Sequence, residues 1–305
     1  MKKAQILHNP TSGDAEHEKD EIRKIVEKSA EVTAYLSTDR PFWERFVSKD
    51  AEIIFVAGGD GTVHKVAKFL LFKDRLPALT PIFLMPYGTA NNIAHTLHIP
   101  EKIKDPRLVS DAELLPFDVG RVKGAQGMDL FLEGMGFGIF PKLIKEMRGR
   151  EKEDGTPSEE LQHTLKHLVK LVEHYVPGKA EFQFDNNEVE GHFLLAECLN
   201  INFIGPNIKL APHADPGDGQ LDLVLIREDK REELISYLKS LIAGTEKPEI
   251  LKEFTETHRV RKLKMKWSGS DVHVDDDLVE DYKNTFLEVE VDPAQLRFVP
   301  GNKEE

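Results

Sequence analysis

The stretch VAGGDGTVHK, residues 56–65, places three glycines, an aspartate and a threonine in five consecutive positions. The segment before them, AEIIFVA (51–57), contains the continuous apolar run that is typical of a strand buried on both faces. The residues after them include an apolar set at helical spacing: Val63, Val66, Ala67, Leu70 and Leu71. The stretch is therefore predicted to join a buried strand to an amphipathic helix.

The same alternation extends through the first third of the chain. Further strands are predicted at KAQILH (3–8), EVTAYLST (31–38) and TPIFLMP (80–86). Helices are predicted at DAEHEKDEIRKIVEKSA (14–30), around PFWERFVS (41–48) and from NNIAHTL (91–97). Strands that alternate with helices predict a parallel, doubly wound α/β sheet.

The remainder of the chain is rich in strand-like segments. They are LFLEGMGFGI (130–139), KAEFQFDN (179–186), HFLLAECLNINFI (192–204), LDLVLIR (221–227), LKMKWSG (263–269), DVHVDDD (271–277) and TFLEVEVD (285–292). This pattern predicts antiparallel β-structure, as a sandwich or an open barrel. Two helical segments are expected within it, roughly Phe140–Tyr175 and Glu232–Ile242, with a surface loop at RGREKEDGTPSEE (148–160).

A shift in composition near Pro116 predicts the domain boundary. We expect an α/β domain at 1–116, joined by the C-terminal segment 293–305, and a β-rich domain at 117–292.

Charge and apolar runs exclude some classes of protein. The 305-residue chain has a net charge of -13, which argues against a nucleic-acid partner. Its single cysteine, Cys198, cannot form an intramolecular disulfide, which suits a reducing compartment. Runs such as IIFVA are far shorter than the roughly 20 apolar residues that a spanning helix requires. We therefore predict a cytoplasmic protein, with any contact to the inner membrane face being peripheral; its oligomeric state is not predicted.

The glycine cluster at residues 58–61 has the chemistry of an anion site. Glycines at the carboxyl end of a parallel strand let backbone N–H groups approach an anion, and the following helix adds its positive end. Asp60 would repel a phosphate but would suit a metal ion or a hydroxyl. The alternative is a tight strand–helix turn in which Asp60 or Thr62 caps the helix.

Two further turns repeat this arrangement. HNPTSGD (8–14) offers Asn9, Thr11, Ser12 and Gly13 after the first strand, and MPYGTANN (85–92) offers Gly88, Thr89 and Asn91 after the fourth. Because the carboxyl ends of parallel strands lie at one edge of a sheet, we expect the three turns to converge there.

Together these motifs resemble the catalytic domain of the diacylglycerol kinase superfamily, which includes bacterial lipid kinases, sphingosine kinases and ceramide kinases. NPTSG, GGDGT and PYGTANN occur in the family's order, followed by LAPHADPGDGQLDL (210–223) and VHVDDD (272–277). The resemblance covers essentially the whole chain. It implies an N-terminal nucleotide-binding domain like that of NAD kinases and phosphofructokinases, a C-terminal β-sandwich, and Mg²⁺-dependent transfer from ATP to a lipid hydroxyl in the cleft between them.

The resemblance also implies roles for individual residues. The residues implied around ATP are Asn9, Pro10, Thr11, Ser12, Gly13, Thr38, Gly58, Gly59, Asp60, Gly61, Thr62, Gly88, Thr89 and Asn91. Asp60 would organise the catalytic magnesium and the phosphates. A structural metal would bind Asp215, Asp218 and the backbone of Gln220, a donor set suited to a hard cation.

The general base implied by the resemblance is Asp277. The family's Asp-Gly-Glu is replaced here by Asp275-Asp276-Asp277. Aspartate is one methylene shorter than glutamate, so its carboxylate would stop about 1–1.5 Å short, and errors of about 1 Å can cost about 100-fold in rate. The family's GT-x-ND is GTANN here, and His64-Lys65 replaces the usual Asn-Glu after GGDGT.

Two other functions stay open from the sequence. One is an NAD-kinase-like enzyme with a non-lipid acceptor, since GGDGT also occurs there. The other is a nucleotide- or lipid-binding regulator that has lost the base. A membrane-docking helix at FPKLIKEMRGR (140–150), with Lys142, Lys145, Arg148 and Arg150, is a further hypothesis, although many ordinary surface helices have the same pattern.

Overall fold

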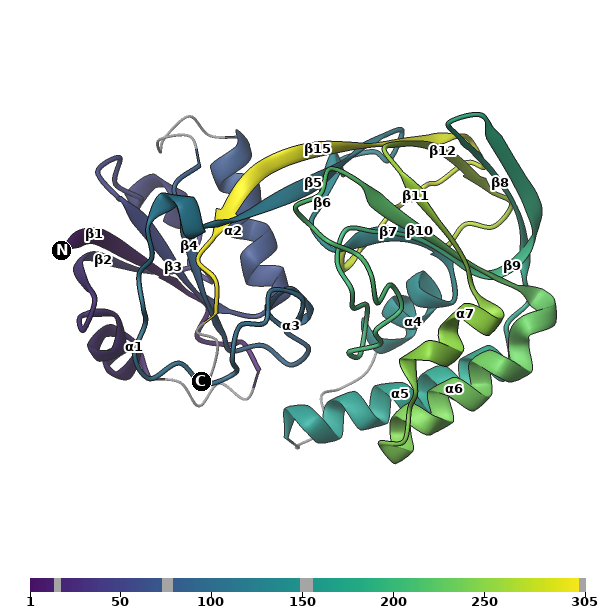
Figure 1. The fold of residues 1–305 in the computed structure, drawn as a ribbon, viewed down its shortest axis with the longest axis horizontal. Coiled ribbons are helices and arrows are strands. Elements are labelled where there is room, and N and C mark those ends of the chain that lie inside the picture. The colour runs from purple at the N-terminus through teal and green to yellow at the C-terminus, as the bar shows by residue number, and fades with distance from the viewer. Residues whose placement is uncertain (14–17, 73–78, 149–155, 302–305) are drawn as a thin grey trace. The chain divides into compact units, whose positions relative to one another are not determined.

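The structure is a computed structural model that describes residues 1–13, 18–72, 79–148 and 156–301 (Figure 1). The chain forms two compact units. The first consists of Met1–Phe117 and Ala294–Glu305, and the second of Asp118–Pro293. Strands β5 (Leu115–Lys123) and β15 (Leu287–Phe298) carry the chain across the two boundaries.

The first unit is a parallel sheet with helices between its strands. Its strands are β1 (Lys2–His8), β2 (Ala30–Ser37), β3 (Ile53–Gly58) and β4 (Ile82–Pro86). Its helices are α1 (Lys19–Val26), α2 (Asp60–Phe72) and α3 (Asn92–Thr96). The strand order is β2-β1-β3-β4, and Phe298 of β15 adds a parallel pairing to Ile82. The predicted doubly wound α/β domain is confirmed.

Burial explains the apolar run that precedes the glycines. All six residues of β3 are buried, because strands β1 and β4 flank it and side chains pack on both of its faces. One face contributes Ile53, Phe55 and Ala57 to a core that also contains Ile6 and Ile22.

The second unit consists of antiparallel strands and a layer of helices. In addition to β5 and β15, its strands are β6 (Leu130–Phe131), β7 (Gly134–Gly138), β8 (Gly178–Phe184), β9 (Asn187–Leu199), β10 (Leu221–Arg227), β11 (Glu256–Val260), β12 (Lys262–Trp267), β13 (Val272–Val274) and β14 (Asp277–Leu278). Its helices are α4 (Ile139–Arg148), α5 (Pro157–His174), α6 (Arg231–Ala243) and α7 (Leu251–Phe254). The prediction of a β-rich second domain is confirmed.

Strands β9 and β10 separate two cores in this unit. On β10, Leu221, Leu223 and Leu225 belong to the core that the strands enclose. Val224 and Ile226 belong to the core beneath the helices, which lie along one face of the strands in Figure 1. Side chains on a strand alternate between faces, and both faces are covered here, so the sequence shows an unbroken apolar run.

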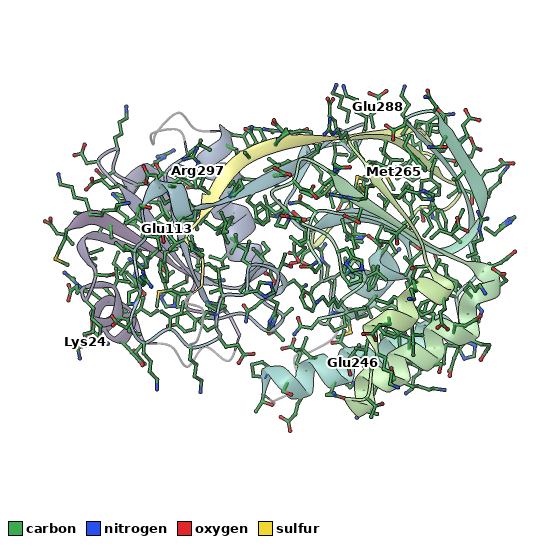
Figure 2. The ribbon with its side chains drawn as sticks, viewed as in Figure 1. Lys24, Glu113, Glu246, Met265, Glu288 and Arg297 are labelled. Carbon is green, nitrogen blue, oxygen red and sulfur yellow. The ribbon has the colours of Figure 1, made fainter. Side chains whose placement is uncertain are left out.

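Strand β12 has one buried face and one face exposed to solvent. Figure 2 places Met265 inside the unit and Glu288, on the neighbouring strand β15, at its surface. Met265 is fully buried, whereas the charged residues of these strands pair with one another, as Lys264 does with Glu288 at 3.0 Å.

Several element boundaries differ from the sequence prediction. Strands β5 and β11 were not predicted, and the helical segment expected at Phe140–Tyr175 consists of two helices, α4 and α5. The expected surface loop at 148–160 ends earlier, since α5 begins at Pro157. The Thr156 and Glu159 side chains form a capping box there, and proline occupies the first turn. That Thr-Pro-x-Glu pattern was a readable helix start.

The hypothesis of a docking helix at 140–150 finds no support in α4. Its apolar residues Ile139, Phe140 and Leu143 are buried in the helix-covered core. Its basic residues are paired within the unit: Lys142 with Glu146 at 3.6 Å, Lys145 with Asp271 at 3.8 Å and Arg148 with Asp277 at 3.0 Å. Arg150 lies outside the described residues. Across the described ranges, no helix combines the length and apolar character needed to cross a membrane.

Candidate active site

Four strand ends of the first unit are tied together by backbone hydrogen bonds. Asn9 N–H, after β1, donates to the Ala57 carbonyl at 2.9 Å. Thr38 N–H, after β2, donates to the His8 carbonyl at 2.8 Å. Tyr87 N–H, after β4, donates to the Gly58 carbonyl at 3.1 Å. The segments 9–13, 58–62 and 87–91 therefore begin side by side at one edge of the sheet.

Glycines allow the three loops to touch backbone to backbone. A Cβ on Gly59 would lie 2.8 Å from Gly88 Cα, and a Cβ on Gly13 would lie 2.7 Å from the Tyr87 carbonyl oxygen. Gly13 also has φ of +58°, which favours glycine. The sequence suggested that glycine was needed where the backbone approaches something closely. In the structure, the backbone that Gly13, Gly59 and Gly88 approach is that of another of the three loops.

Asp60 connects two of these loops through its carboxylate. Its Oδ2 accepts the Asn92 N–H at 2.9 Å and its Oδ1 accepts the Ile93 N–H at 3.1 Å. These amides begin α3, so the carboxylate caps a helix that starts 32 residues later in the chain. The carboxylate therefore holds the start of α3 beside the loop that follows β3.

Several predicted nucleotide-binding side chains shape the loops themselves. Asn9 Oδ1 accepts the Thr11 hydroxyl at 2.9 Å. Asn91 has φ of +53° and exchanges two 2.8 Å hydrogen bonds with the Gly88 backbone. The Thr62 side chain is buried against Gly58. These side chains order the loops, so the groups suited to an anion are backbone amides such as those of Gly59 and Gly61.

The other predicted nucleotide-binding residues lie in the same loops. Pro10 and Ser12 lie between Asn9 and Gly13, and Thr89 lies between Gly88 and Asn91; all three are half-buried. Gly61 is exposed in the first turn of α2.

A cavity of about 520 Å³ opens in the first unit beside the end of β2. Thr38 and Lys65 line it together with aromatic side chains, among them Phe42, Trp43 and Phe69. Thr38 is buried, and its hydroxyl donates to the His8 carbonyl at 3.3 Å. The cavity therefore continues from one of the clustered strand ends.

We expect Gly88→Ala to weaken nucleotide binding strongly. The new Cβ would collide with Gly59 Cα and lie 2.7 Å from Asn91 Oδ1, so the loops would have to separate. Overpacking of this kind costs about 1–3 kcal/mol of folding stability. Calorimetric titration with ATP should show at least an about tenfold higher Kd, since about 1.4 kcal/mol lost in binding corresponds to tenfold. Gly127→Ala, in the second unit, is the control for a destabilising glycine substitution: no atom lies within 4 Å of its Cβ position, but its φ of +79° strains alanine, and its Kd should stay unchanged. An unchanged Kd for Gly88→Ala would contradict the loop geometry.

The Asp275-Asp276-Asp277 tract divides into one buried and two exposed carboxylates. Asp275 is buried, and its carboxylate accepts N–H groups of Leu132, Glu133 and Gly134 at 2.8–3.2 Å. Asp277, the predicted base, is exposed and begins β14. Arg148 Nη2 lies 3.0 Å from Asp277 Oδ1 and donates to the Asp276 carbonyl at 2.6 Å.

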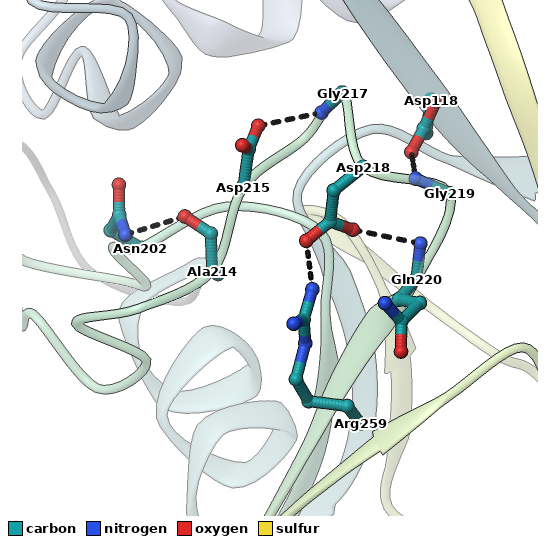
Figure 3. Close-up of polar contacts among 9 residues, drawn as sticks. All are labelled: Asp118, Asn202, Ala214, Asp215, Gly217, Asp218, Gly219, Gln220 and Arg259. Carbon is teal, nitrogen blue, oxygen red and sulfur yellow. Dashed lines mark hydrogen bonds and ion pairs between the residues drawn. The ribbon is translucent and has the colours of Figure 1, made fainter.

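The predicted metal ligands Asp215 and Asp218 point at their own backbone. Figure 3 shows Asp215 Oδ1 accepting the Gly217 N–H at 2.9 Å and Asp218 Oδ1 accepting the Gln220 N–H at 2.9 Å. The other Asp218 oxygen pairs with the Arg259 guanidinium. The positively charged Arg259 side chain thus already pairs with the carboxylate that a metal ion would need. Among the described residues, no three His, Cys, Asp or Glu side chains form a metal-binding group.

Arg259 also lies opposite Asp222 in the β10–β11 pairing. Burial raises the pKa of Asp222 to about 6, and Arg259 acts against that rise. As arranged, the donor set Asp215, Asp218 and Gln220 does not fit a divalent ion.

We therefore expect removal of divalent ions to leave the thermal stability of the nucleotide-free protein unchanged. Arg259→Ala should lower the Tm by at most about 2 °C, since a half-exposed ion pair contributes at most about 1 kcal/mol. Scanning calorimetry with EDTA or Mg²⁺ measures both effects. Lys262→Ala, which removes the exposed pair with Glu290, is the control. A Tm that falls by several degrees on chelation would restore the metal prediction.

Two residues of this region escaped the sequence prediction. Asp118 Oδ2 accepts the Gly219 N–H at 2.6 Å, and Arg259 holds Asp218 (Figure 3). Asp118 lies in the unpredicted β5 and Arg259 in the unpredicted β11. The only available signal was the apolar alternation of PFDVGRV, which a short strand shows weakly.

Comparison with known proteins accounts for this arrangement. A model of the diacylglycerol kinase catalytic domain matches residues 3–122, and a model of the YegS C-terminal NAD kinase beta sandwich-like domain matches residues 150–300. The chain belongs to the diacylglycerol kinase superfamily. The predicted family, its fold and its class, a lipid kinase, are confirmed at this level.

Individual relatives are similar along most of their length. A diacylglycerol kinase of Bacillus subtilis (strain 168) is 27% identical over 270 residues, covering 86% of each chain. A diacylglycerol kinase of Mycobacterium tuberculosis is 23% identical over 287 residues, covering 90% of this chain and 88% of the relative. A crystal structure of a diacylglycerol kinase from Bacillus anthracis str. Sterne shares the fold with a TM-score of 0.70 and 18% identity, covering 99% of this chain and 97% of that one.

Proposed function

We propose that this protein transfers the γ-phosphoryl group of ATP to the hydroxyl of a diacylglycerol-like lipid. The observation that carries the proposal is the backbone contact among three glycine-bearing loops at the carboxyl ends of parallel strands. Such an edge presents amide N–H groups and the positive end of α2 to an anion.

The nucleotide is proposed to lie along these loops in the first unit. Its phosphates would lie beside the segments 9–13, 59–62 and 88–89, and its base would enter the cavity beside Thr38, where the wall is aromatic. Asp60 is proposed to lie beside the catalytic magnesium, because a carboxylate oxygen is a ligand that this ion prefers; when bound, the ion would neutralise charge on the phosphates. Asp60 itself keeps the loops after β3 and β4 in one arrangement.

Asp277 is proposed to accept the proton of the lipid hydroxyl. Because Asp277 is exposed, an acceptor can reach its carboxylate. Asp275, which is bound by backbone amides, fixes the turn that leads to Asp277. Arg148 pairs with the carboxylate and must give way, or shift, for the acceptor hydroxyl to take its place. The proposal requires the first unit to supply the nucleotide and the second to supply the base and the lipid-binding surface.

The test is an assay with labelled ATP, Mg²⁺ and a total lipid extract, followed by mass analysis of the labelled product. We expect a phosphorylated glycerolipid. NAD is tested in parallel, and labelled NADP as the product would favour the NAD-kinase-like alternative. ATP binding by calorimetry without any product would favour a regulator, for which the Arg148–Asp277 pair is the supporting observation.

Membrane association follows from the proposed acceptor and is proposed to be peripheral. A diacylglycerol-like lipid lies in a bilayer, and the described helices offer no membrane span. Flotation with vesicles that contain diacylglycerol should therefore recover bound protein that high salt or alkaline wash releases.

A further inference from the structure

Three residues form one row across strands β9, β7 and β13 of the second unit. Gly136 of β7 pairs with Glu197 of β9 on one side and with His273 of β13 on the other. The Glu197 and His273 side chains reach across it, and Glu197 Oε2 lies 2.8 Å from His273 Nε2. A Cβ on Gly136 would collide with that same carboxylate oxygen and with the Ala196 carbonyl. The glycine leaves the space in which the two side chains meet.

This row lies on the helix-covered face of the strands. Met135 and Phe137, the neighbours of Gly136, belong to the core on the other face, as do Val272 and Val274 beside His273. Helix α4 packs against β7, β9 and β13. Glu197 is fully buried and His273 is 3% exposed, so water does not solvate the pair.

The second imidazole nitrogen holds the turn of the predicted base. His273 Nδ1 lies 2.7 Å from the Asp275 carbonyl oxygen. A carbonyl only accepts, so Nδ1 carries a proton and donates it. The other ring nitrogen, Nε2, shares a proton with Glu197. Nδ1 can therefore keep its own proton, whether the shared one lies on the imidazole or on the carboxyl group. Burial raises the pKa of Glu197. Burial lowers the pKa of His273, but the charge and hydrogen bond of Glu197, together with Asp275, outweigh it and raise that pKa overall.

Asp275 is thereby held through every polar group that it has. Its carboxylate accepts the amides of residues 132–134, its N–H donates to the Gly134 carbonyl at 2.7 Å, and its carbonyl accepts from His273. Its φ of +49° is unusual for a residue other than glycine and needs such support. Asp276 and Asp277 follow directly and are exposed.

Stability alone does not explain the buried Glu197–His273 pair. Glu197 Oε1 has no hydrogen-bond partner among the described residues. An unpartnered buried carboxylate oxygen destabilises the fold, and an apolar pair of similar size would cost less. The hydrogen bond to Asp275 is what an apolar replacement would lose.

We propose that Glu197 and His273 are positioning residues for the Asp275–Asp277 turn and thus for the base of the proposed kinase reaction. Glu197 fixes the imidazole ring through Nε2 so that Nδ1–H points at Asp275, and His273 fixes the Asp275 carbonyl. This inference rests on the proposed function of Asp277, and it assigns a role to the GMGFG segment (134–138), whose central glycine admits the pair.

The test compares His273→Asn with His273→Gln. The asparagine amide lies where Nδ1 lies and still donates to the Asp275 carbonyl, whereas the glutamine amide lies near Nε2 and reaches Glu197 instead. We expect His273→Gln to lower kcat by about 10- to 100-fold at unchanged KM for ATP, and His273→Asn to stay within about threefold of the wild type. His258→Gln, on β11 against Phe184, is the control with unchanged kcat. Equal kcat values for the two His273 variants would overturn the proposal.

A second readout needs no turnover. The amides of Leu132, Glu133 and Gly134 are bound by Asp275, so their hydrogen exchange reports the position of the turn. Exchange should accelerate in His273→Gln and not in His273→Asn; no acceleration in either overturns the positioning role. An inactive wild type would instead refute the proposed function, and the exchange comparison would still decide on the pair.

Discussion

Replacing Asp277 by asparagine is expected to lower kcat for lipid phosphorylation by about 100- to 10,000-fold, the range that a positioned general base contributes. Asparagine has nearly the same shape but does not accept the hydroxyl proton. The side chain is exposed and makes its ion pair with Arg148, so the fold should not change. Initial rates at saturating ATP with the acceptor lipid from the extract measure the effect, and ATP binding should be unaltered.

Two neighbouring variants sharpen this result. Asp276→Asn changes the adjacent exposed aspartate and should leave kcat unchanged. Asp277→Glu restores the length of the family's glutamate and should match or exceed the wild-type rate, since about 1 Å in placement is worth about 100-fold. A kcat for Asp277→Asn within about tenfold of the wild type would remove Asp277 from the chemistry and favour another base.

Asp60→Asn should abolish detectable transfer from ATP, with a loss of at least about 100-fold, while the protein stays folded. The carboxylate accepts amides of both Asn92 and Ile93. An asparagine keeps one acceptor and turns an NH₂ group toward the other amide, so the loops after β3 and β4 separate. An unmet hydrogen bond of this kind costs about 1–3 kcal/mol of folding stability.

Binding separates this variant from the Asp277 variant. Asp60→Asn should weaken both ATP and Mg²⁺–ATP binding in calorimetry, whereas Asp277→Asn should bind nucleotide normally. Asp50→Asn, an exposed aspartate after η1 (Trp43–Phe46), is the control for a generic loss of charge. Wild-type-like turnover of Asp60→Asn would exclude Asp60 from the mechanism.

Local sequence determined the elements of the first unit and the loops between them. Strand β3 is buried on both faces and therefore appears as the unbroken run IIFVA, and Gly59 and Gly88 are glycines because no Cβ fits between their backbones. The parallel order brings the ends of β1, β3 and β4 together, so strand–helix alternation was enough to place Asn9, Gly59 and Thr89 at one edge. Helix boundaries were predicted less accurately where a capping residue sets them, as Thr156 does at the start of α5.

Only the tertiary structure decided what the carboxylates do, and the physical reason is separation along the chain. Asp60 binds amides 32 and 33 residues away, Asp275 binds amides 141–143 residues away, and Arg259 reaches Asp218 across 41 residues. Glu197 meets His273 because both pair with Gly136 in neighbouring strands. Strand register creates these contacts. An aspartate that caps a helix, supports a turn or accepts a proton is the same letter in the sequence, and its partners alone distinguish the three.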